Sequence, residues 1–360
     1  MNKKTLLHLD YPLMYALVLM SMLSLVILYS AGGENLSILL RQAARMLAAF
    51  VIMIAVAQIP PEALARWTPW IYGVGVILLV VVLAIGVIGK GAQRWINLGL
   101  FRFQPAEVMK LGVPMMAAWV FSRKPLPPSP GRLIIGAITI GVPTALIILQ
   151  PDLGTAILVA AAGVFVIFLS GISWRILTGL GIIATALAPV AWHFMHDYQK
   201  RRVLTLFNPE ADPLGSGYHI IQAKIAIGSG GVYGKGWTNG SQSQLDFIPE
   251  RHTDFIFAVF GEEFGLIGAS ILLLLYSYII GRGLYIAISA TDTYSRLLAG
   301  SLSITFFFYV FVNIGMVSGI LPVVGVPLPL VSYGGTSMVT LMAGFGILMS
   351  IHSRRRLISS

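Results

Sequence analysis

The sequence predicts an all-α polytopic membrane protein with about ten transmembrane helices and one large extracytoplasmic loop after the seventh. Hydrophobic residues make up 57% of the 360 residues and charged residues only 11%, whereas a soluble domain carries about 25% charged residues. Apolar runs of about 20 residues, the length that spans a bilayer, recur along the whole chain. Lipid must therefore replace water around most of the surface, and we expect residues 1–360 to form a single membrane domain.

The basic charge balance and the absence of cysteine narrow the classes of function. The net charge is +10, but multispanning proteins collect Lys and Arg in cytoplasmic loops. Basic segments interleaved with aromatic residues, which bind single-stranded nucleic acid, are missing from the sequence. The chain has no cysteine, which excludes disulfides, thiolate catalysis and cysteine-based metal sites. Nucleic acid is therefore not an expected partner.

The predicted spans follow from the apolar runs between charged or Pro- and Gly-containing segments. The first run is longer than the 7–15 apolar residues of a signal peptide, so we expect it to remain as an uncleaved span. Pro105, Pro151 and Gly154 stand where helices are expected to begin. The ten predicted spans are 11–31, 38–58, 69–88, 105–122, 132–149, 154–170, 174–195, 253–281, 296–319 and 330–351.

The distribution of charges between the loops predicts the orientation of the chain. With the N-terminus inside, the inner segments hold twelve cations and three acids, and the outer segments hold twelve cations and eleven acids. Lys and Arg accumulate on the cytoplasmic side because they resist translocation. We therefore expect both termini to be cytoplasmic and the long loop, about 196–252, to be extracytoplasmic.

Several cations in short outer segments run against this rule. One interpretation is local pairing with Glu34 and Glu107, together with side chains that reach toward the interface. The other is that these cations meet an anionic substrate that approaches from outside. The cations are Arg41, Arg45, Lys90, Arg94, Arg102 and Lys110.

The long loop contains a glycine-rich run, Gly228–Trp237, after residues 218–227, whose apolar positions recur at helical spacing. That spacing predicts a short helix lying against the membrane. The run does not match the phosphate-binding motif G-x-x-x-x-G-K-[ST], because Gly236 follows Lys235 where Ser or Thr belongs. A flexible loop is the favoured interpretation, and a nest of backbone N–H groups that holds an anion is the alternative.

The acidic residues Glu107, Asp152 and Asp254 are candidates for catalysis or substrate binding. Glu107 and Lys110 are three residues apart and share a helix face. They are either a first-turn acid with a snorkelling lysine, or a charge pair that lines the same cavity as Asp254. Asp152 is expected to cap the sixth span.

Asp254 lies where the long loop ends and the eighth span begins. Thr253 can cap that helix, so Asp254 is available for another role. An acid at the edge of an apolar span is partly removed from water, which makes it a better general base. The alternative is a first-turn partner of the helix dipole. Glu262 and Glu263 follow about two turns later, partly on the same face.

Several segments together resemble the SEDS family, the shape, elongation, division and sporulation proteins. Ser318–Pro327 resembles the elongation branch of the family, because division members usually have Thr-Lys where Val323 and Val324 stand. The other segments that carry the resemblance are Lys90–Ile96, Phe103–Pro105, Gln150–Thr155, Asp246–Phe257, Glu262–Leu266 and Pro327–Gly335.

The resemblance implies a peptidoglycan glycosyltransferase that uses lipid II at the outer face of the cytoplasmic (inner) membrane during cell elongation. It implies a class B penicillin-binding transpeptidase of the elongation type as partner, along with other membrane proteins of the elongation machinery. The essential aspartate of the family corresponds to Asp254. Trp95, Glu107 and Lys110 match further positions that the family is thought to use.

The implied chemistry assigns a role to each candidate residue. The donor is an α-linked diphosphate and the product a β-1,4 glycan, so one inversion needs a single displacement. Asp254 would act as general base on the acceptor hydroxyl. Arg94, Lys110, Arg202 and Lys235 would bind substrate and stabilise the departing diphosphate.

Two points stay open at this stage. A divalent cation, Mg²⁺ or Mn²⁺, is a possible source of the positive charge, although no cofactor is certain. Two other functions are a lipid II flippase and a scaffold without activity of its own that activates its transpeptidase.

Overall fold

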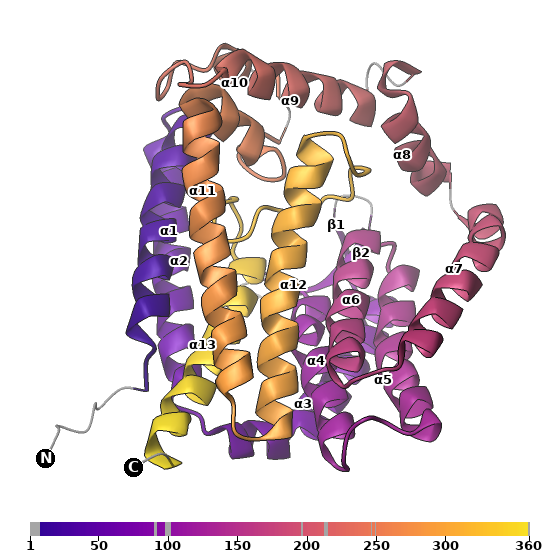
Figure 1. Ribbon diagram of the computed structural model, residues 1–360. Helices are drawn as coiled ribbons and strands as arrows, with labels where there is room; N and C mark the ends of the chain where they lie inside the picture. The colour runs from indigo at the N-terminus through magenta and orange to yellow at the C-terminus, as the bar shows by residue number, and fades with distance from the viewer. Residues whose placement is uncertain are drawn as a thin grey trace, which may run out of the picture.

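The computed structural model describes residues 8–89, 92–97, 102–195, 197–211, 215–245, 247–248 and 250–358. It is a bundle of long helices with a layer of short helices across one end (Figure 1). The long helices are α1 (Tyr11–Ala31), α2 (Leu36–Ala57), α3 (Pro61–Ile85), α4 (Pro105–Ser122), α5 (Pro130–Leu149), α6 (Leu153–Leu169), α7 (Trp174–Phe194), α11 (Ile256–Ser289), α12 (Thr293–Val317) and α13 (Thr336–Ile358). The short ones are α8 (Asp197–Phe207), α9 (Ser216–Gly230), α10 (Ser241–Gln244) and a 3₁₀ turn at Pro209–Ala211.

The prediction of a multispanning helical membrane protein is confirmed. A helix lies in each of the ten predicted ranges. Within the described part of the chain, seven helices are long and apolar enough to cross a membrane: α1, α2, α3, α5, α11, α12 and α13. The chain is therefore a multi-pass protein of the bilayer.

Among the described helices, α1, α2, α6 and α12 begin with a polar side chain that caps one of the first N–H groups. Asp10 accepts a hydrogen bond from Leu13 N at 2.9 Å and so caps α1. Asp292 caps α12 in the same way through Ser295 N, also at 2.9 Å.

Some predicted boundaries were wrong by up to eight residues. α3 begins at Pro61, well before the predicted 69, because proline is well placed in the first turn of a helix. α13 begins at Thr336 instead of 330, since residues 318–335 form turns and extended backbone. α11 contains a break at Gly265, where φ is 61° and ψ is −160°.

The described interior holds two larger apolar cores, both with residues of α4, and a smaller cluster around Tyr309. The larger core joins α1, α2, α11, α12 and α13, with α2 packed on α13 and α11 on α12. The smaller core lies between α3, α4, α5 and α6.

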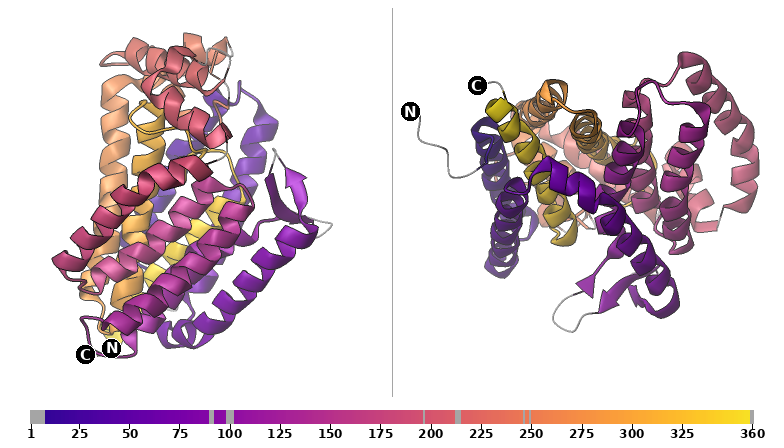
Figure 2. Two further views of the ribbon diagram at one scale, coloured as in Figure 1. Left: turned by 90° about the vertical axis from the view of Figure 1, so that its right-hand side faces the viewer. Right: turned by 90° about the horizontal axis from the view of Figure 1, so that it is seen from below.

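The layer of α8, α9 and α10 lies at the end of the bundle opposite to the start of α1 and the end of α13 (Figures 1 and 2). The predicted short helix at 218–227 is confirmed as part of α9. α9 packs on α11 and also contacts α12. The long loop is therefore a structured cover over one end of the bundle.

A small antiparallel sheet, which the sequence analysis did not predict, stands beside α3 and α4 (Figure 2). Its strands are β1 (Val87–Gly89), β2 (Ala92–Asn97) and β3 (Arg102–Phe103), in the order β1-β2-β3. The register of β1 and β2 shifts at Arg94, because Val87 pairs with Trp95 and Ile88 with Gln93.

The glycine-rich run is neither a flexible loop nor an anion nest. Its backbone packs directly against the break in α11, with Lys235 N donating to Glu262 O and Leu266 N donating to Gly231 O, each at 3.0 Å. A Cβ at Gly234 would lie 2.1 Å from Glu263 O, and φ at Gly234 is +79°. Glycine is required there because no side chain fits between the two backbones.

This packing predicts opposite effects for two neighbouring substitutions. Gly234→Ala should destabilise the protein by more than the roughly 1–2 kcal/mol of a left-handed alanine, because the methyl group also collides with the backbone. Gly228→Ala is the matched control: it lies in α9 with nothing within 4 Å of its Cβ position, and alanine favours helix by about 1 kcal/mol. Thermal unfolding of the purified proteins in detergent should show a lower Tm for the first variant only. Equal Tm values would contradict the packing.

Candidate functional site

Asp254 lies in a polar cavity of about 660 Å³ at the end of the bundle where α8 lies. Segments from five parts of the chain meet there: β2, the start of α6, α8, the end of the long loop and the segment before α13. Two predicted cations, Arg94 and Arg202, line the same cavity as the predicted base. The remaining lining residues are Pro151, Asp152, Leu153, Gly154, Glu250, Thr253, Val324, Gly325, Pro327, Tyr333, Gly334 and Ser337.

The backbone on both sides of Asp254 is fixed by hydrogen bonds from distant helices and loops. The buried amide of Asn313 in α12 donates to Asp254 O at 2.9 Å. Ser332 Oγ donates to Thr253 O at 2.6 Å, and Tyr333 N donates to His252 O at 2.8 Å. These bonds hold the main chain that carries the carboxylate against the floor of the cavity.

The predicted cap at Thr253 was wrong. α11 begins at Ile256, two residues later than that cap requires, with Phe255 in the cap position. The Thr253 hydroxyl instead donates to Glu250 Oε2 at 2.8 Å. A local bond within the turn thus competes with the cap, as hydroxyl side chains commonly do. Asp254 remains outside the helix, on the turn that lines the cavity.

Asp152 confirms the predicted cap and also anchors a cation. Its Oδ1 accepts from Thr155 N at 3.3 Å. Its Oδ2 contacts Arg94 Nη1 at 3.2 Å and accepts from Gln104 Nε2 at 2.9 Å. Arg94 is therefore held in one orientation at the cavity wall while about a quarter of its side chain stays exposed.

Trp95 points away from Arg94 into a second cavity of about 600 Å³. This cavity has a largely apolar lining between α2, α4, α13 and the sheet. Arg45 lines it, and the Arg45 guanidinium lies 4.8 Å from the ring centre of Tyr333, a residue of the first cavity. Two pairs of neighbours in sequence, Arg94 with Trp95 and Gly334 with Gly335, are divided between the cavities. The wall between the two cavities is thus about one residue thick.

Glu107 and Lys110 form the predicted pair, with Lys110 Nζ 2.7 Å from Glu107 Oε1. The prediction that they line the Asp254 cavity was wrong. Glu107 lines the Trp95 cavity, and Lys110 faces a small internal cavity of about 40 Å³, with its Nζ 5.4 Å from the Tyr309 ring centre. Spacing along α4 predicted the pairing, but the cavity that each group meets depends on the segments packed around α4.

One oxygen of Glu107 is available to a ligand. Its Oε2 is buried and makes no hydrogen bond with the residues that the structure describes. A buried carboxylate oxygen without a donor is costly. Since Glu107 lines the Trp95 cavity, a hydroxyl or amide group of a ligand there could supply that donor.

Lys235 is not brought to the site. Its Nζ lies 2.8 Å from Glu262 Oε1 and 2.7 Å from Ser241 Oγ, and the described linings of both cavities leave it out. The sequence analysis also missed Tyr333, although it stands in the Pro327–Gly335 motif. The motif marked this segment, but only the fold shows that Tyr333 lines the Asp254 cavity and lies against Arg45 of the Trp95 cavity.

The described residues contain no group of three or more His, Asp or Glu side chains placed to hold a metal ion. Positive charge in the Asp254 cavity comes from Arg94 and Arg202.

The fold agrees with the comparisons to known proteins. The family of cell cycle proteins that includes FtsW, RodA and SpoVE matches residues 4–357. The chain belongs to this family.

Curated relatives and solved structures match over nearly the whole chain. It is 54% identical to the peptidoglycan glycosyltransferase MrdB of Escherichia coli, over 99% of this chain and 98% of the relative. It is 36% identical to MrdB of Helicobacter pylori, over 98% of this chain and 92% of the relative. A chain of a peptidoglycan synthase complex has a TM-score of 0.84 at 30% identity, covering 96% of this chain and 98% of that one. The Thermus thermophilus rod shape determining protein RodA has a TM-score of 0.75 at 29% identity, covering 98% and 99%.

The buried pair in α4 yields a prediction. Glu107→Gln and Lys110→Met should each destabilise the protein by roughly 3–5 kcal/mol, because each leaves an uncompensated buried charge. The exchanged variant, Glu107→Lys with Lys110→Glu, should recover much of the stability. It should not recover activity, because the carboxylate would no longer face the Trp95 cavity. Tm in detergent and glycan synthesis by the same preparations test this, and full activity of the exchanged variant would show that the pair is purely structural.

Proposed function

We propose that this chain is a peptidoglycan glycosyltransferase that polymerises lipid II into β-1,4 glycan strands during cell elongation. The observation that carries the proposal is a single cavity that holds an aspartate beside two arginines, in a chain 54% identical to a peptidoglycan glycosyltransferase. A carboxylate and fixed positive charges are the two elements that transfer of a sugar from a diphosphate needs.

In the proposed mechanism Asp254 is the general base. Its carboxylate takes the proton from the acceptor 4-hydroxyl as that oxygen attacks the anomeric carbon of the donor. The bond from this carbon to the diphosphate oxygen breaks on the opposite face, so the α linkage becomes β. The fixed backbone around Asp254 keeps the base at one position during the transfer.

The departing diphosphate gains negative charge as the bond breaks, so it needs positive charge more than a proton. Arg94, oriented by Asp152, and Arg202 line the cavity and can supply it. Arginine suits this role because its planar group binds phosphate oxygens in pairs.

The Trp95 cavity is proposed to hold a neighbouring part of a lipid-linked saccharide. Its lining combines a flat aromatic ring with the unpartnered oxygen of Glu107 and the guanidinium of Arg45. The ring can cover the apolar face of a sugar, and the carboxylate can accept from a hydroxyl or amide group.

The proposed topology has ten spans, with both termini cytoplasmic and the α8–α10 layer outside. The charge bias of the sequence supports this orientation. So does the position of the start of α1 and the end of α13 at the end of the bundle opposite to α8–α10 (Figure 1). The cavities then open toward the outer leaflet of the cytoplasmic membrane, where lipid II would be met.

The topology predicts the labelling of a single introduced cysteine. The chain has no native cysteine, and Ser229 lies exposed near the end of α9. Ser229→Cys should react with a membrane-impermeant thiol reagent in intact spheroplasts. Reaction only after the membrane is broken would reverse the orientation.

The proposed partner is a class B penicillin-binding transpeptidase, together with other membrane proteins of the elongation machinery. The similar chain in a peptidoglycan synthase complex supports this pairing. A transpeptidase would crosslink the strands that the polymerase extends.

The proposed base predicts the result of one nearly isosteric substitution. Asp254→Asn cannot accept a proton and should lower polymerisation of lipid II by at least about 10²-fold, the typical contribution of a general base. The purified complex with its transpeptidase should be assayed by sizing the glycan products. Asp292→Asn, at the cap of α12, is a matched control that should retain activity because asparagine caps helices as well as aspartate.

The same variant separates the alternative functions. Normal polymerisation by Asp254→Asn would reject the assignment of the base. If the variant still binds the transpeptidase but makes no glycan, the chain acts as an enzyme and not only as a scaffold. Movement of labelled lipid II across vesicles by the inactive variant would instead support a flippase.

A further inference from the structure

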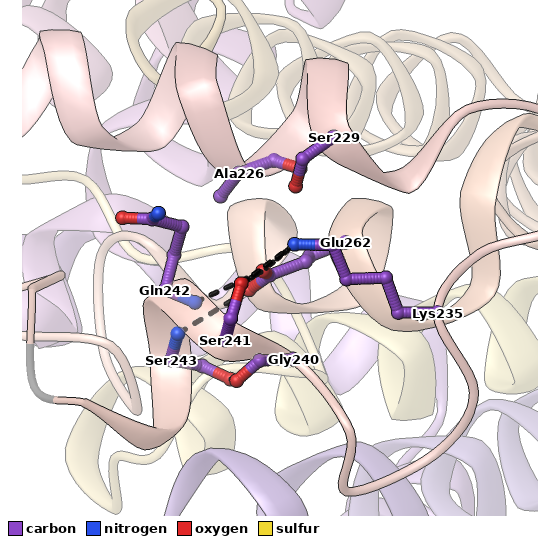
Figure 3. A network of polar contacts seen from close by, with 8 residues as sticks. All are labelled: Ala226, Ser229, Lys235, Gly240, Ser241, Gln242, Ser243 and Glu262. Atoms are coloured by element: carbon purple, nitrogen blue, oxygen red, sulfur yellow. Dashed lines mark hydrogen bonds and ion pairs between the residues drawn. The ribbon is translucent and has the colours of Figure 1, made fainter.

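The segment that carries Asp254 is attached at both ends to one short turn, α10. On one side, Arg251 precedes Asp254 by three residues. On the other side, Glu262 follows it by eight residues and is fully buried. Figure 3 shows Glu262 between Lys235 and the residues of α10.

Glu262 receives four hydrogen bonds or charge contacts. Its Oε1 accepts from Lys235 Nζ at 2.8 Å, from Gln242 N at 2.9 Å and from Ser241 Oγ at 3.2 Å. Its Oε2 accepts from Ser243 N at 3.2 Å. Both oxygens are thus held by backbone N–H groups of α10, and the lysine neutralises the buried charge.

The second attachment runs through Arg251, whose guanidinium donates to Ser243 O. Ser243 therefore binds Glu262 through its N–H and Arg251 through its carbonyl. We name this arrangement of Arg251, α10 and Glu262 the α10 clamp.

The part of α11 that follows Gly265 cannot by itself determine the orientation of the segment that carries Asp254. Gly265 adopts a left-handed conformation that interrupts α11, so residues 256–264 are separated from the membrane helix that follows. An interrupted helix does not transmit the orientation of one part to the other. The direction of the short part must therefore be set by contacts, and the clamp provides them on the outer side.

We infer that Glu262 is a positioning residue for Asp254, acting through the α10 clamp. This inference rests on the proposed function, in which Asp254 is the base. A displacement of about 1 Å of a catalytic group can lower a rate about 10²-fold. Lys235, predicted to bind substrate, belongs to this positioning device.

The test compares Glu262→Gln with wild type in the purified complex with its transpeptidase. Glutamine has the same shape, but its NH₂ group must face the N–H of either Gln242 or Ser243, because both oxygens of Glu262 accept from the backbone. We expect kcat to fall about 10–100-fold while KM for lipid II stays within about twofold, since positioning affects the chemical step more than substrate binding.

Glu263→Gln is the matched control. Glu263 is the next residue and is also buried, but its carboxylate accepts from Ser30 of α1 and not from α10. The carbonyl of glutamine can still accept that bond. Both variants remove a buried carboxylate from one segment, so the loss of Tm should be similar or smaller for Glu263→Gln, whereas kcat should stay near the wild-type value.

The other arm of the clamp gives a second, independent variant. Arg251→Met removes the bond to Ser243 O and should lower kcat without the loss of a buried carboxylate. Combined with Glu262→Gln, its effect on kcat should be smaller than the product of the two single effects, because both act on one clamp. If Glu262→Gln does not fold, Arg251→Met decides the question.

The remaining outcomes distinguish failure of the positioning role from failure of the proposed function. Wild-type kcat in Glu262→Gln and Arg251→Met, with Asp254→Asn inactive, overturns the positioning role and leaves the proposed function intact. Equal losses of kcat in Glu262→Gln and Glu263→Gln, in step with Tm, also overturn it. Activity of Asp254→Asn would overturn the proposed function itself.

Discussion

The site depends on a stretch of irregular backbone, residues 318–335, that lies inside a bundle of membrane helices. Non-helical backbone at this depth is tolerated only where the protein satisfies its polar groups, because lipid offers no hydrogen bonds. Side chains from four helices meet this requirement. The bonds are Ser24 Oγ to Val331 O at 3.0 Å, Gln42 Nε2 to Ser332 O at 3.4 Å, Tyr276 OH to Pro329 O at 2.6 Å and Asn313 Nδ2 to Val326 O at 2.7 Å. The cavity exists because these helices stabilise non-helical backbone at a place where a continuous helix would fill the space.

Asn313 connects the hydrogen bonding of this irregular segment to the position of Asp254. Its one amide group donates both to the irregular segment and to the carbonyl of Asp254. A polar group buried in α12 thus determines the distance between the cavity floor and the segment with the base. The amide group of Asn313 thus satisfies backbone carbonyl groups and also positions the carboxylate of Asp254.

The sequence predicted those features that depend on neighbours along the chain. Runs of apolar residues located the helices, and spacing of three predicted the contact between Glu107 and Lys110. The cap at Asp152 followed from its place before a helix. Features that depend on distant segments were not predictable in this way. Nothing near Lys235 indicates that Glu262, 27 residues later, binds it, and nothing near Gly265 shows that another backbone lies against it.

Of the cations that the sequence left with two interpretations, Arg94 and Lys110 are paired, with Asp152 and Glu107. Lys235, in the long loop, is paired with Glu262. Pairing by itself would suggest a structural role for these charges. Yet Arg94 lines the Asp254 cavity with part of its guanidinium exposed, whereas Lys235, whose side chain is 29% exposed, is absent from the described linings of both cavities. The difference between a binding cation and a structural one is therefore not whether it is paired or exposed, but whether its remaining N–H groups face the cavity.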